Sequence, residues 1–426
     1  GFLWLILLRF AVSAAAPQGS LVMSDTGGRG ILMLSCQMMP EVFGGAEQQC
    51  LRLSRALRAM GERPQILTSV STDGIPEYEN VDGVPITRLR VPSPPQMGGR
   101  RILSSVKWML AAQKWITQHA GEISLIHCHQ AKLNAWVGVR AAKRLGVPSL
   151  VKLGTAGQNL DFYSLERKKF VWGKVAAQEI ARDATRIVSI SKEMYDDTRA
   201  FGIPEPRCQL IPNGVEPVTP ITAEERASLR AELGVLPGER LLLFVGRMER
   251  QKNVETLLTA LSQIPYDRFP TRLAMLGDGA LLDVHRDMAR SVGLGGRAVF
   301  VGRVSDVGRY LGASDLLVLP ALAEGMSNAL LEAMAAGVPQ VASSVSGNTD
   351  LIVQGETGWL YGAPRDADAL RAKIETALSM KDAALDNVGA SAQHRVQEFY
   401  SIEAVARRYL ALYDDLLSET QIHAVA

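Results

Sequence analysis

At 426 residues, 47% hydrophobic and 21% charged, the chain is too long for a single hydrophobic core, and its composition excludes a disordered or fibrous protein. We therefore expect two domains or three. The net charge is only +2, but residues 1–215 hold 26 Lys and Arg against 17 Asp and Glu, whereas residues 216–426 hold 20 against 27, so the front half, at +9, either favours anionic partners such as acidic lipid headgroups or merely aids solubility.

The chain opens with an apolar stretch, GFLWLILLRFAVSAAAPQG, which resembles a truncated signal peptide interrupted by Arg9. No apolar segment reaches the length of about 18–20 residues that a membrane-spanning helix needs. Met23 opens a natural cytosolic start before the first strand, so we expect residues 1–28 to be disordered or artefactual. The four cysteines are widely scattered, which favours reduced thiols in a cytosolic protein over a disulfide framework or a zinc site.

Strand-like apolar runs alternate with helix-period segments in the first half of the chain. Strands are predicted at 31–35, 64–69, 84–91, 124–129, 148–154 and 186–191, and helices at 46–61, 101–121 and 131–145. Residues 210–222, LIPNGVEPVTPIT, are rich in Pro and Gly and lack periodicity, so they predict a domain linker.

The alternation restarts after the linker. Strands are predicted at 240–246, 271–277, 298–302, 316–321 and 339–344, and helices at 254–264, 281–294, 307–315, from about 327, and 401–419. Two such series predict two α/β Rossmann-like domains, at 29–212 and 213–395, that face each other across a cleft. Residues 396–426 are expected to pack back on the first domain. Ligands of such sheets bind at the carboxyl ends of the strands, so the cleft is the expected site.

Two cations follow the first strand of the second domain. Arg247 comes directly after Gly246 and Lys252 lies just before a helix. The planar guanidinium of Arg247 and the ammonium group of Lys252 at a strand end suit the binding of a diphosphate, although a solvated loop is the simpler alternative. Two later strand ends carry Gly277, where a tight turn lets backbone approach a ligand, and Arg303, where a nucleotide base could lie against backbone.

The segment EGMSNALLE, residues 324–332, carries two carboxylates with a predicted helix start between them. Free amide groups at that helix start, around Ser327–Asn328, attract a phosphate. Glu324 precedes them and can accept hydrogen bonds from sugar hydroxyls, and Glu332, two turns along, can grip the two hydroxyls of a ribose. The spacing of the two glutamates is common by chance, but Arg247 and Lys252 upstream make the donor-site interpretation stronger.

Together these motifs resemble the retaining nucleotide-sugar glycosyltransferases of family 4, which have the two-domain GT-B fold. The matching segments are GRMERQK, LGDG, EGMSNALLEAMAAGVPQVAS, GNTDLI and GETGWLY, with VFGGAEQQ, IVSISKEM and IPNGV in the first half. The resemblance covers roughly residues 29–420. It implies transfer of a hexose from a nucleotide-diphosphate sugar to a hydroxyl of a glycan or lipid-linked glycan, in polysaccharide or glycolipid biosynthesis.

The resemblance also implies roles for individual residues. Arg247 and Lys252 would bind the donor diphosphate, Glu324 would hold hydroxyls of the transferred sugar, and Glu332 would hold the ribose. Arg247, Lys252 and Glu324 are the catalytic candidates, because charge develops on the diphosphate. No metal is required if these cations do that work, and no cofactor is expected beside the sugar donor. The DAD at 366–368 suits a helix cap better than a manganese site.

Further residues are assigned to the donor side. Gly44 and Gly45 would form a loop that lets the first domain close over the phosphates, and backbone amides after Glu324 would complete the phosphate cradle. The donor-side set comprises Gly44, Gly45, Gly277, Arg303, Gly325, Met326, Ser327, Asn328 and Glu332.

One position departs from the family pattern. Many members carry a histidine at the end of a first-domain strand, near the reacting carbon, whereas Gly154 stands there in this chain. His127, His129, Lys152 and Thr155 are the alternatives for the acceptor side. A histidine on a strand is more often buried and satisfied than catalytic, so a structural role is the competing interpretation.

The sequence gives less information about the acceptor than about the donor. The predicted helix at 100–120 carries Arg100, Arg101, Lys107 and Lys114, with Trp108 and Trp115 seven residues apart. This pattern suits a helix that docks on anionic lipid, or an ordinary helix that buries both tryptophans. We expect a cytoplasmic protein, peripheral on the inner face of the membrane, and no nucleic-acid partner. The alternative functions are a non-catalytic nucleotide-sugar-binding protein and a nucleotide-sugar epimerase.

Overall fold

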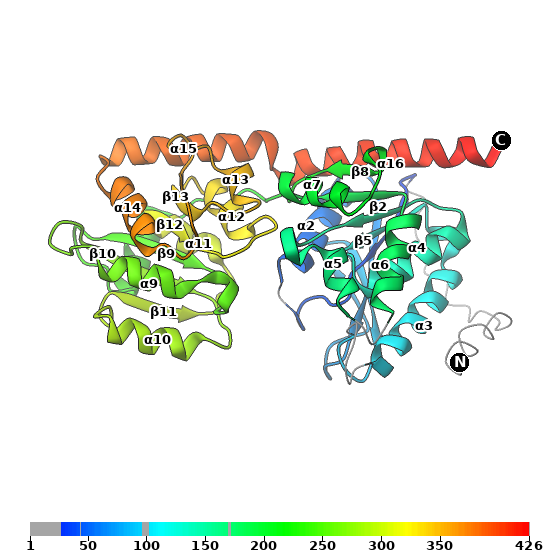
Figure 1. Ribbon diagram of the computed structural model, residues 1–426, viewed down its shortest axis with the longest axis horizontal. Coiled ribbons are helices and arrows are strands. Elements are labelled where there is room, and N and C mark those ends of the chain that lie inside the picture. The colour runs from blue at the N-terminus through cyan, green and yellow to red at the C-terminus, as the bar shows by residue number, and fades with distance from the viewer. Residues whose placement is uncertain (1–26, 43, 96–101, 169–171, 426) are drawn as a thin grey trace.

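A computed structural model describes residues 27–42, 44–95, 102–168 and 172–425, and of residues 421–425 only the backbone. The expectation for residues 1–28 therefore falls almost entirely outside the described residues, as do Arg100 and Arg101. Figure 1 shows two lobes, each an open sheet covered by helices, with two consecutive helices running along one side of the whole molecule.

The first lobe is built on an eight-stranded sheet in the order β3-β4-β2-β1-β5-β6-β7-β8. Its neighbouring strands are parallel except for β3 against β4. The strands are β1 Gly30–Leu34, β2 Arg63–Val70, β3 Tyr78–Val81, β4 Val84–Arg90, β5 Leu125–His129, β6 Ser149–Lys152, β7 Arg186–Ser189 and β8 Cys208–Leu210. The helices are α2 Gly45–Ala59, α3 Ile102–Gln118, α4 Leu133–Leu145, α5 Asp161–Glu166, α6 Gly173–Asp183 and α7 Lys192–Ala200.

Both faces of this sheet are buried, which explains why its strands are continuous apolar runs. Side chains alternate across a strand, so Ile31 and Met33 of β1 pack with α2, whereas Leu32 and Leu34 pack with α3, α4 and α6 on the other face. Trp108 of α3 is completely buried in this second layer. Trp115 stacks on His119 at 4.0 Å between ring centroids. The tryptophans of α3 therefore do not form an exposed membrane-binding face.

The second lobe is a six-stranded, fully parallel sheet in the order β11-β10-β9-β12-β13-β14. Its strands are β9 Arg240–Val245, β10 Thr271–Leu276, β11 Ala298–Gly302, β12 Leu316–Leu319, β13 Gln340–Ser343 and β14 Trp359–Tyr361. Its helices are α8 Ala223–Glu232, α9 Val254–Ser262, α10 Leu282–Ser291, α11 Val307–Ala313, α12 Asn328–Ala335, α13 Asn348–Leu351, α14 Ala367–Leu378 and α15 Asp382–Phe399. The predicted pair of Rossmann-like domains is confirmed.

The chain crosses between the lobes twice, and the two crossings are joined. Val215 donates its backbone N–H to Tyr400 O at 2.9 Å, and Ile402 donates to Val215 O at 2.9 Å. The last helix, α16 Ile402–Val425, then lies against α2 of the first lobe (Figure 1). Within the described part of the chain, no helix combines the length and the apolar composition needed to cross a membrane.

The strand order reverses direction once in each sheet. In the first lobe this happens between β1 and β5, and in the second between β9 and β12. At such a switch point the loops that leave the carboxyl ends of two neighbouring strands diverge and leave a crevice for a ligand. The topology therefore predicts a ligand-binding site at the loops after these four strands.

Candidate functional site

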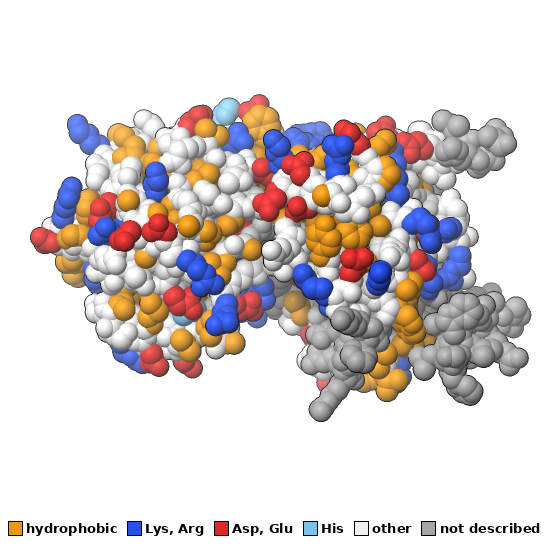
Figure 2. Space-filling model, viewed as in Figure 1, with side chains coloured by type: hydrophobic (Ala, Val, Ile, Leu, Met, Phe, Trp, Pro, Cys, Tyr) orange, Lys and Arg blue, Asp and Glu red, His pale blue; other side chains and the backbone are white. Residues whose placement is uncertain are grey.

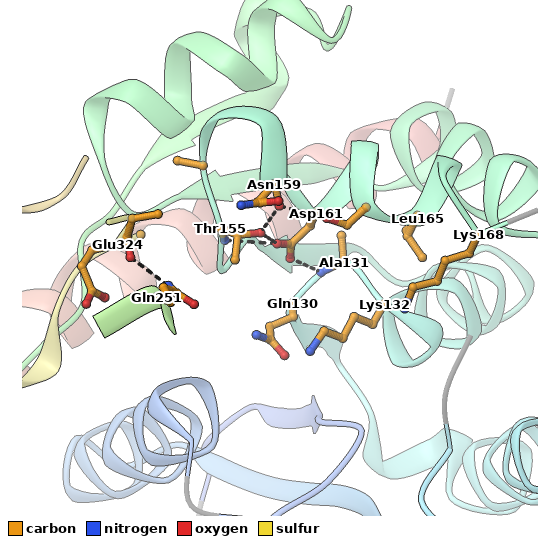
Figure 3. Close-up of a pocket in the computed structure, with 14 residues that line it drawn as sticks. Gln130, Ala131, Lys132, Thr155, Asn159, Asp161, Leu165, Lys168, Gln251 and Glu324 are labelled. Atoms are coloured by element: carbon orange, nitrogen blue, oxygen red, sulfur yellow. Dashed lines mark hydrogen bonds between the residues drawn. The ribbon is translucent and has the colours of Figure 1, made fainter. Parts of the chain in front are cut away.

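A cavity of about 400 Å³ lies between the lobes at these loops. Figure 3 shows side chains entering it from both domains. The first domain contributes Gln130, Ala131, Lys132, Thr155, Ala156, Asn159, Asp161, Ser164, Leu165 and Lys168, and the second contributes Gln251, Ala323, Glu324 and Gly325. Most of these residues follow β5 and β6 on one side, and β9 and β12 on the other.

On the second-domain wall the carboxylate of Glu324 is paired with the ammonium group of Lys252, which is not itself a cavity-lining residue. Lys252 Nζ lies 2.6 Å from Glu324 Oε1, and their side chains are only 17% and 9% exposed. Gln251 donates its side-chain Nε2 to Ala323 O at 2.8 Å, and Leu322 donates to Gln251 O at 2.8 Å. These bonds tie the loop after β9 to the loop after β12, so the lysine and the glutamate are held together. Arg247, by contrast, is 63% exposed and pairs with Glu249 at 2.9 Å.

The predicted helix after Glu324 is present as α12. Ser327 caps it by accepting a hydrogen bond from Leu330 N at 3.3 Å, and the serine is buried. Met326 is also buried, and its sulfur accepts from Asn213 N at 3.3 Å. Both side chains are thus occupied by the fold, which leaves the backbone amides at this helix end as the groups that can meet an anion.

Asn328 and Glu332 of α12 face the first domain. Asn328 Oδ1 accepts from Gln49 Nε2 at 3.0 Å, and its Nδ2 donates to Gly45 O at 3.3 Å. Glu332 accepts from Arg52 Nη2 at 2.5 Å, and both side chains are largely buried. The predicted ribose carboxylate is therefore engaged by an arginine of α2, a partner that the sequence pattern did not suggest.

Two of the predicted glycines permit close backbone approach. A Cβ on Gly277, whose φ is +131°, would lie 1.9 Å from Gly246 O, and a Cβ on Gly325 would lie 2.5 Å from Gly154 O. The first contact joins the loops after β9 and β10, and the second joins the two domains at the cavity. Gly44 precedes α2 as its N-cap residue. Arg303 is exposed in the segment after β11.

Asp161 organises the first-domain wall. Its carboxylate accepts hydrogen bonds from the backbone of Ala131 at 2.9 Å, Gly154 at 3.2 Å and Thr155 at 3.1 Å, and from the Thr155 hydroxyl. It therefore holds together the loops after β5 and β6 (Figure 3). Burial raises the pKa of Asp161 although these donors oppose the rise. With its oxygens bonded to the fold, Asp161 positions the wall and is not a free base.

Gln130 occupies the space beside Gly154. Its backbone lies in the left-handed region at φ +69°, a conformation that non-glycine residues adopt mainly where structure or function requires it. A Cβ on Gly154 would lie 2.9 Å from Gln130 Nε2. The glutamine amide thus fills the place into which a side chain at position 154 would project.

Of the four acceptor-side candidates, Thr155 alone lines the cavity. His127, His129 and Lys152 are buried away from the cavity, and His127 and Lys152 lie against Tyr409 of α16. His127 Nδ1 lies 2.7 Å from Tyr413 Oη, and the rings of His127 and His129 stack at 4.5 Å. Burial lowers the pKa of both histidines, and it lowers the pKa of Lys152 to about 8. The structure does not bring these three side chains to the cavity.

The sequence reasoning missed several wall residues, namely Gln130, Lys132, Asn159, Asp161, Lys168 and Gln251. A signal for some of them was present, since Gln130 and Lys132 directly follow a predicted strand, where ligand-binding residues gather. Asp161 and Lys168 come from a segment that had no predicted element. Among the described residues, no group of three His, Cys, Asp or Glu side chains is placed to hold a metal ion.

Comparison with known proteins matches both halves of the chain. A family model described as glycosyl transferases group 1 matches residues 225–395, and one described as a glycosyl transferase 4-like domain matches residues 44–214. An uncharacterized glycosyltransferase of Methanocaldococcus jannaschii is 27% identical over 402 residues, which cover 90% of this chain and 97% of the relative.

Two further similarities add detail. A D-inositol 3-phosphate glycosyltransferase of Rhodococcus erythropolis is 30% identical over 266 residues, which cover 58% of each protein. The solved structure of Alr3699/HepE from Anabaena in complex with UDP and glucose superposes with a TM-score of 0.74 at 19% identity, covering 91% of this chain and 99% of that chain. At this identity the structural match speaks for the fold alone.

Proposed function

The chain belongs to the glycosyltransferases of the GT-B fold, and on that premise we propose that it moves a hexose from a nucleotide-diphosphate sugar to a hydroxyl of a glycan or lipid-linked glycan acceptor. The observation that carries this proposal is that Glu324, which lines the cavity between the domains, is paired with Lys252. The pair combines a cation that can bind a diphosphate with a carboxylate that can accept hydrogen bonds from sugar hydroxyls, and the two groups are hydrogen-bonded to each other. The complex of Alr3699/HepE with UDP and glucose is consistent with such a donor.

In the proposed reaction the bond between the anomeric carbon and the diphosphate oxygen breaks, and the acceptor oxygen bonds to that carbon. The proton of the acceptor hydroxyl passes to the departing diphosphate, on the same face of the sugar, so that configuration is retained. Arg247, Lys252 and the amides at the start of α12 would stabilise the charge that develops on the diphosphate. Since two of these groups are cations and the amides offer further hydrogen-bond donors, we infer that no metal ion is required.

A panel of nucleotide sugars, incubated with the protein and with glycan or membrane lipid extract, tests the proposal by mass spectrometry. We expect one donor to be consumed to a new glycoside, and Lys252→Ala or Glu324→Gln to lower kcat/KM about 10²–10³-fold. Arg250→Ala, an exposed cation in the same loop, is the matched control and should retain activity. Proton NMR of the product gives the anomeric configuration, and chelation with EDTA tests metal independence.

The same panel separates the alternatives. A non-catalytic binding protein would bind a donor, lose that binding in Lys252→Ala, and form no product with any acceptor. An epimerase would return the donor as a different nucleotide sugar without an acceptor. Absence of donor binding in the wild-type protein would overturn the proposed role of the Lys252–Glu324 pair.

We also infer work at an anionic membrane surface inside the cell. On the exposed face of α3, Leu103 and Leu110 alternate with Lys107 and Lys114, the arrangement of a helix that inserts apolar side chains among acidic headgroups. Sedimentation with phosphatidylglycerol vesicles should capture the protein, and phosphatidylcholine vesicles should not. Capture that survives replacement of both leucines by serine would contradict this surface, while leaving the transfer reaction untouched.

A further inference from the structure

Two lysines of the first domain enter the cavity from segments far apart in the sequence. Lys132 lies in the loop between β5 and α4, and Lys168 lies just after α5. Figure 3 shows both side chains reaching toward the same part of the cavity, opposite Glu324. They are close enough for Lys132 to repel Lys168, which adds to desolvation in lowering the pKa of Lys168.

Among the described residues neither lysine has a direct ion-pair partner, although the Glu47 and Asp161 carboxylates are close enough to attract Lys132 electrostatically. No carboxylate of the described residues lies within 4.0 Å of the ammonium nitrogen of Lys132 or Lys168. Exposed lysines and arginines elsewhere in the structure, by contrast, do form ion pairs. The two acids that line the cavity are engaged elsewhere. Asp161 accepts hydrogen bonds from the loops after β5 and β6, and Glu324 is paired with Lys252. Placing two like charges together costs free energy unless an anion comes between them.

The surroundings of the two lysines are polar and suit a hydroxylated molecule. Gln130, Thr155, Asn159 and Ser164 line the same cavity, and its volume of about 400 Å³ is that of a small-molecule site. Glu324, which the proposed function assigns to the donor together with its partner Lys252, lies on the opposite wall of the cavity. The lysines therefore stand on the acceptor side of the cavity.

We propose that the acceptor carries an anionic group, a phosphate or a carboxylate, which binds between Lys132 and Lys168 while a hydroxyl of the same molecule points toward the donor sugar at Glu324. This inference rests on the proposed function for the identity of the second substrate. Its anion-binding step, however, depends only on the two lysines. Ammonium groups bind phosphate and carboxylate as point charges through short, charge-assisted hydrogen bonds.

The inference is tested first by binding alone. Glycerol 3-phosphate and glycerate are titrated into the full-length protein by isotope-edited NMR or calorimetry, with glycerol as the neutral probe. We expect the two anions to bind and glycerol not to, about tenfold weaker binding in Lys132→Ala and in Lys168→Ala, and loss in the double variant. Affinity should fall with added salt. Lys174→Ala, an exposed lysine of α6, is the matched control and should bind as the wild type does.

Two further arms keep the outcomes apart. Lys252→Ala should lose donor binding and keep glycerol 3-phosphate binding. If Lys252→Ala loses donor binding but Lys132→Ala and Lys168→Ala bind the anion as the wild type does, the proposed function stands and the inference is overturned. The inference also fails if the anions bind no better than glycerol, or if Lys132→Ala and Lys168→Ala weaken the donor instead of the anion. Micelles of phosphatidic acid, run beside glycerol 3-phosphate, show whether a lipid phosphate or a soluble one is preferred, and either preference supports the inference when the double variant abolishes it.

Discussion

At the scale of single residues, the loops around the cavity depend on positions where a side chain would not fit. Gly277 has a φ of +131°, and the hydrogen atom that a Cβ would replace faces Gly246 O. Gly325 meets the backbone of Gly154 across the domain boundary. Such contacts let the backbone amides and carbonyls of separate loops approach each other, and a Cβ would push them apart.

We predict that Gly277→Ala destabilises the protein by about 2–4 kcal/mol, because the new Cβ would meet Gly246 O at 1.9 Å and the residue would remain in a left-handed conformation. Urea unfolding measures the loss as a lower transition midpoint. Gly296→Ala is the control, since nothing lies within 4 Å of a Cβ there, and its midpoint should stay close to that of the wild type.

A second residue-scale prediction concerns Lys152. Burial lowers its pKa to about 8, whereas the unfolded chain keeps the ordinary value of about 10.4. Between these pH values the unfolded chain binds more protons, so the contribution of Lys152 to the free energy of unfolding increases as pH rises from about 8 and is lost as pH falls through that value. Lys152→Met should therefore raise stability at pH 7 by roughly 2–3 kcal/mol. The gain should shrink toward pH 10 in urea titrations, and a gain independent of pH would contradict the assignment.

At the scale of secondary-structure elements, helices α2 and α12 are joined across the domain boundary. Asn328 and Glu332, one turn apart on α12, bond Gln49 and Arg52 of α2. Glu332 is also the carboxylate expected to hold the donor ribose. A bound nucleotide and Arg52 would then compete for the same oxygens, so this contact couples donor binding to the relative position of the two domains.

We predict that Arg52→Ala lowers the donor KM about threefold to tenfold with little change in kcat, because a partly buried ion pair that competes with the ribose is removed. Arg58→Ala, which removes an exposed arginine in the last turn of the same helix, is the control. A higher KM in Arg52→Ala would show that the arginine itself contacts the donor, and a lower kcat would show that the contact serves catalysis. Initial rates over a donor concentration series distinguish the three results.

At the scale of the whole molecule, the second domain is inserted between parts of the first. The chain leaves the first lobe near Val215 and returns near Ser401, and α16 then completes the core beside α2. Figure 2 shows the two lobes in contact with each other, with acidic, basic and apolar side chains mixed over this face. The crossings joined at Val215 and Ser401 link the two lobes, so we expect any rotation of one lobe against the other to occur about this segment.

We predict that ending the chain after Ser401 abolishes folding of the first domain, because Tyr409, Tyr413 and Leu416 of α16 are fully buried in its core. Expression of the truncated chain should give insoluble protein, or protein with a lost cooperative transition by circular dichroism. Ending the chain after Thr420 is the control, and it should preserve the transition. A soluble, cooperative protein lacking all of α16 would contradict the prediction.

The sequence alone determined the two α/β domains, because hydrophobic periodicity is a local property that marks each strand and helix in order along the chain. It also determined the family, through motifs that stand at strand ends. The hairpin between β3 and β4 was missed although Asp82 and Gly83, both at positive φ, gave a usual turn signal. Helices α5 and α6 lacked a strong enough pattern to be predicted.

Only the tertiary structure decided which strand-end residues share a cavity. Lys132 and Lys168 are 36 positions apart and line the same cavity as Glu324 of the other domain, and no local sequence pattern predicts that these residues come together. The same holds for Lys152, which ends β6 yet lies against Tyr409 of α16, a helix about 250 residues later in the chain. A side chain at a strand end points to one face or the other according to the register of the sheet and the helix that covers it, and both are set by packing between distant segments.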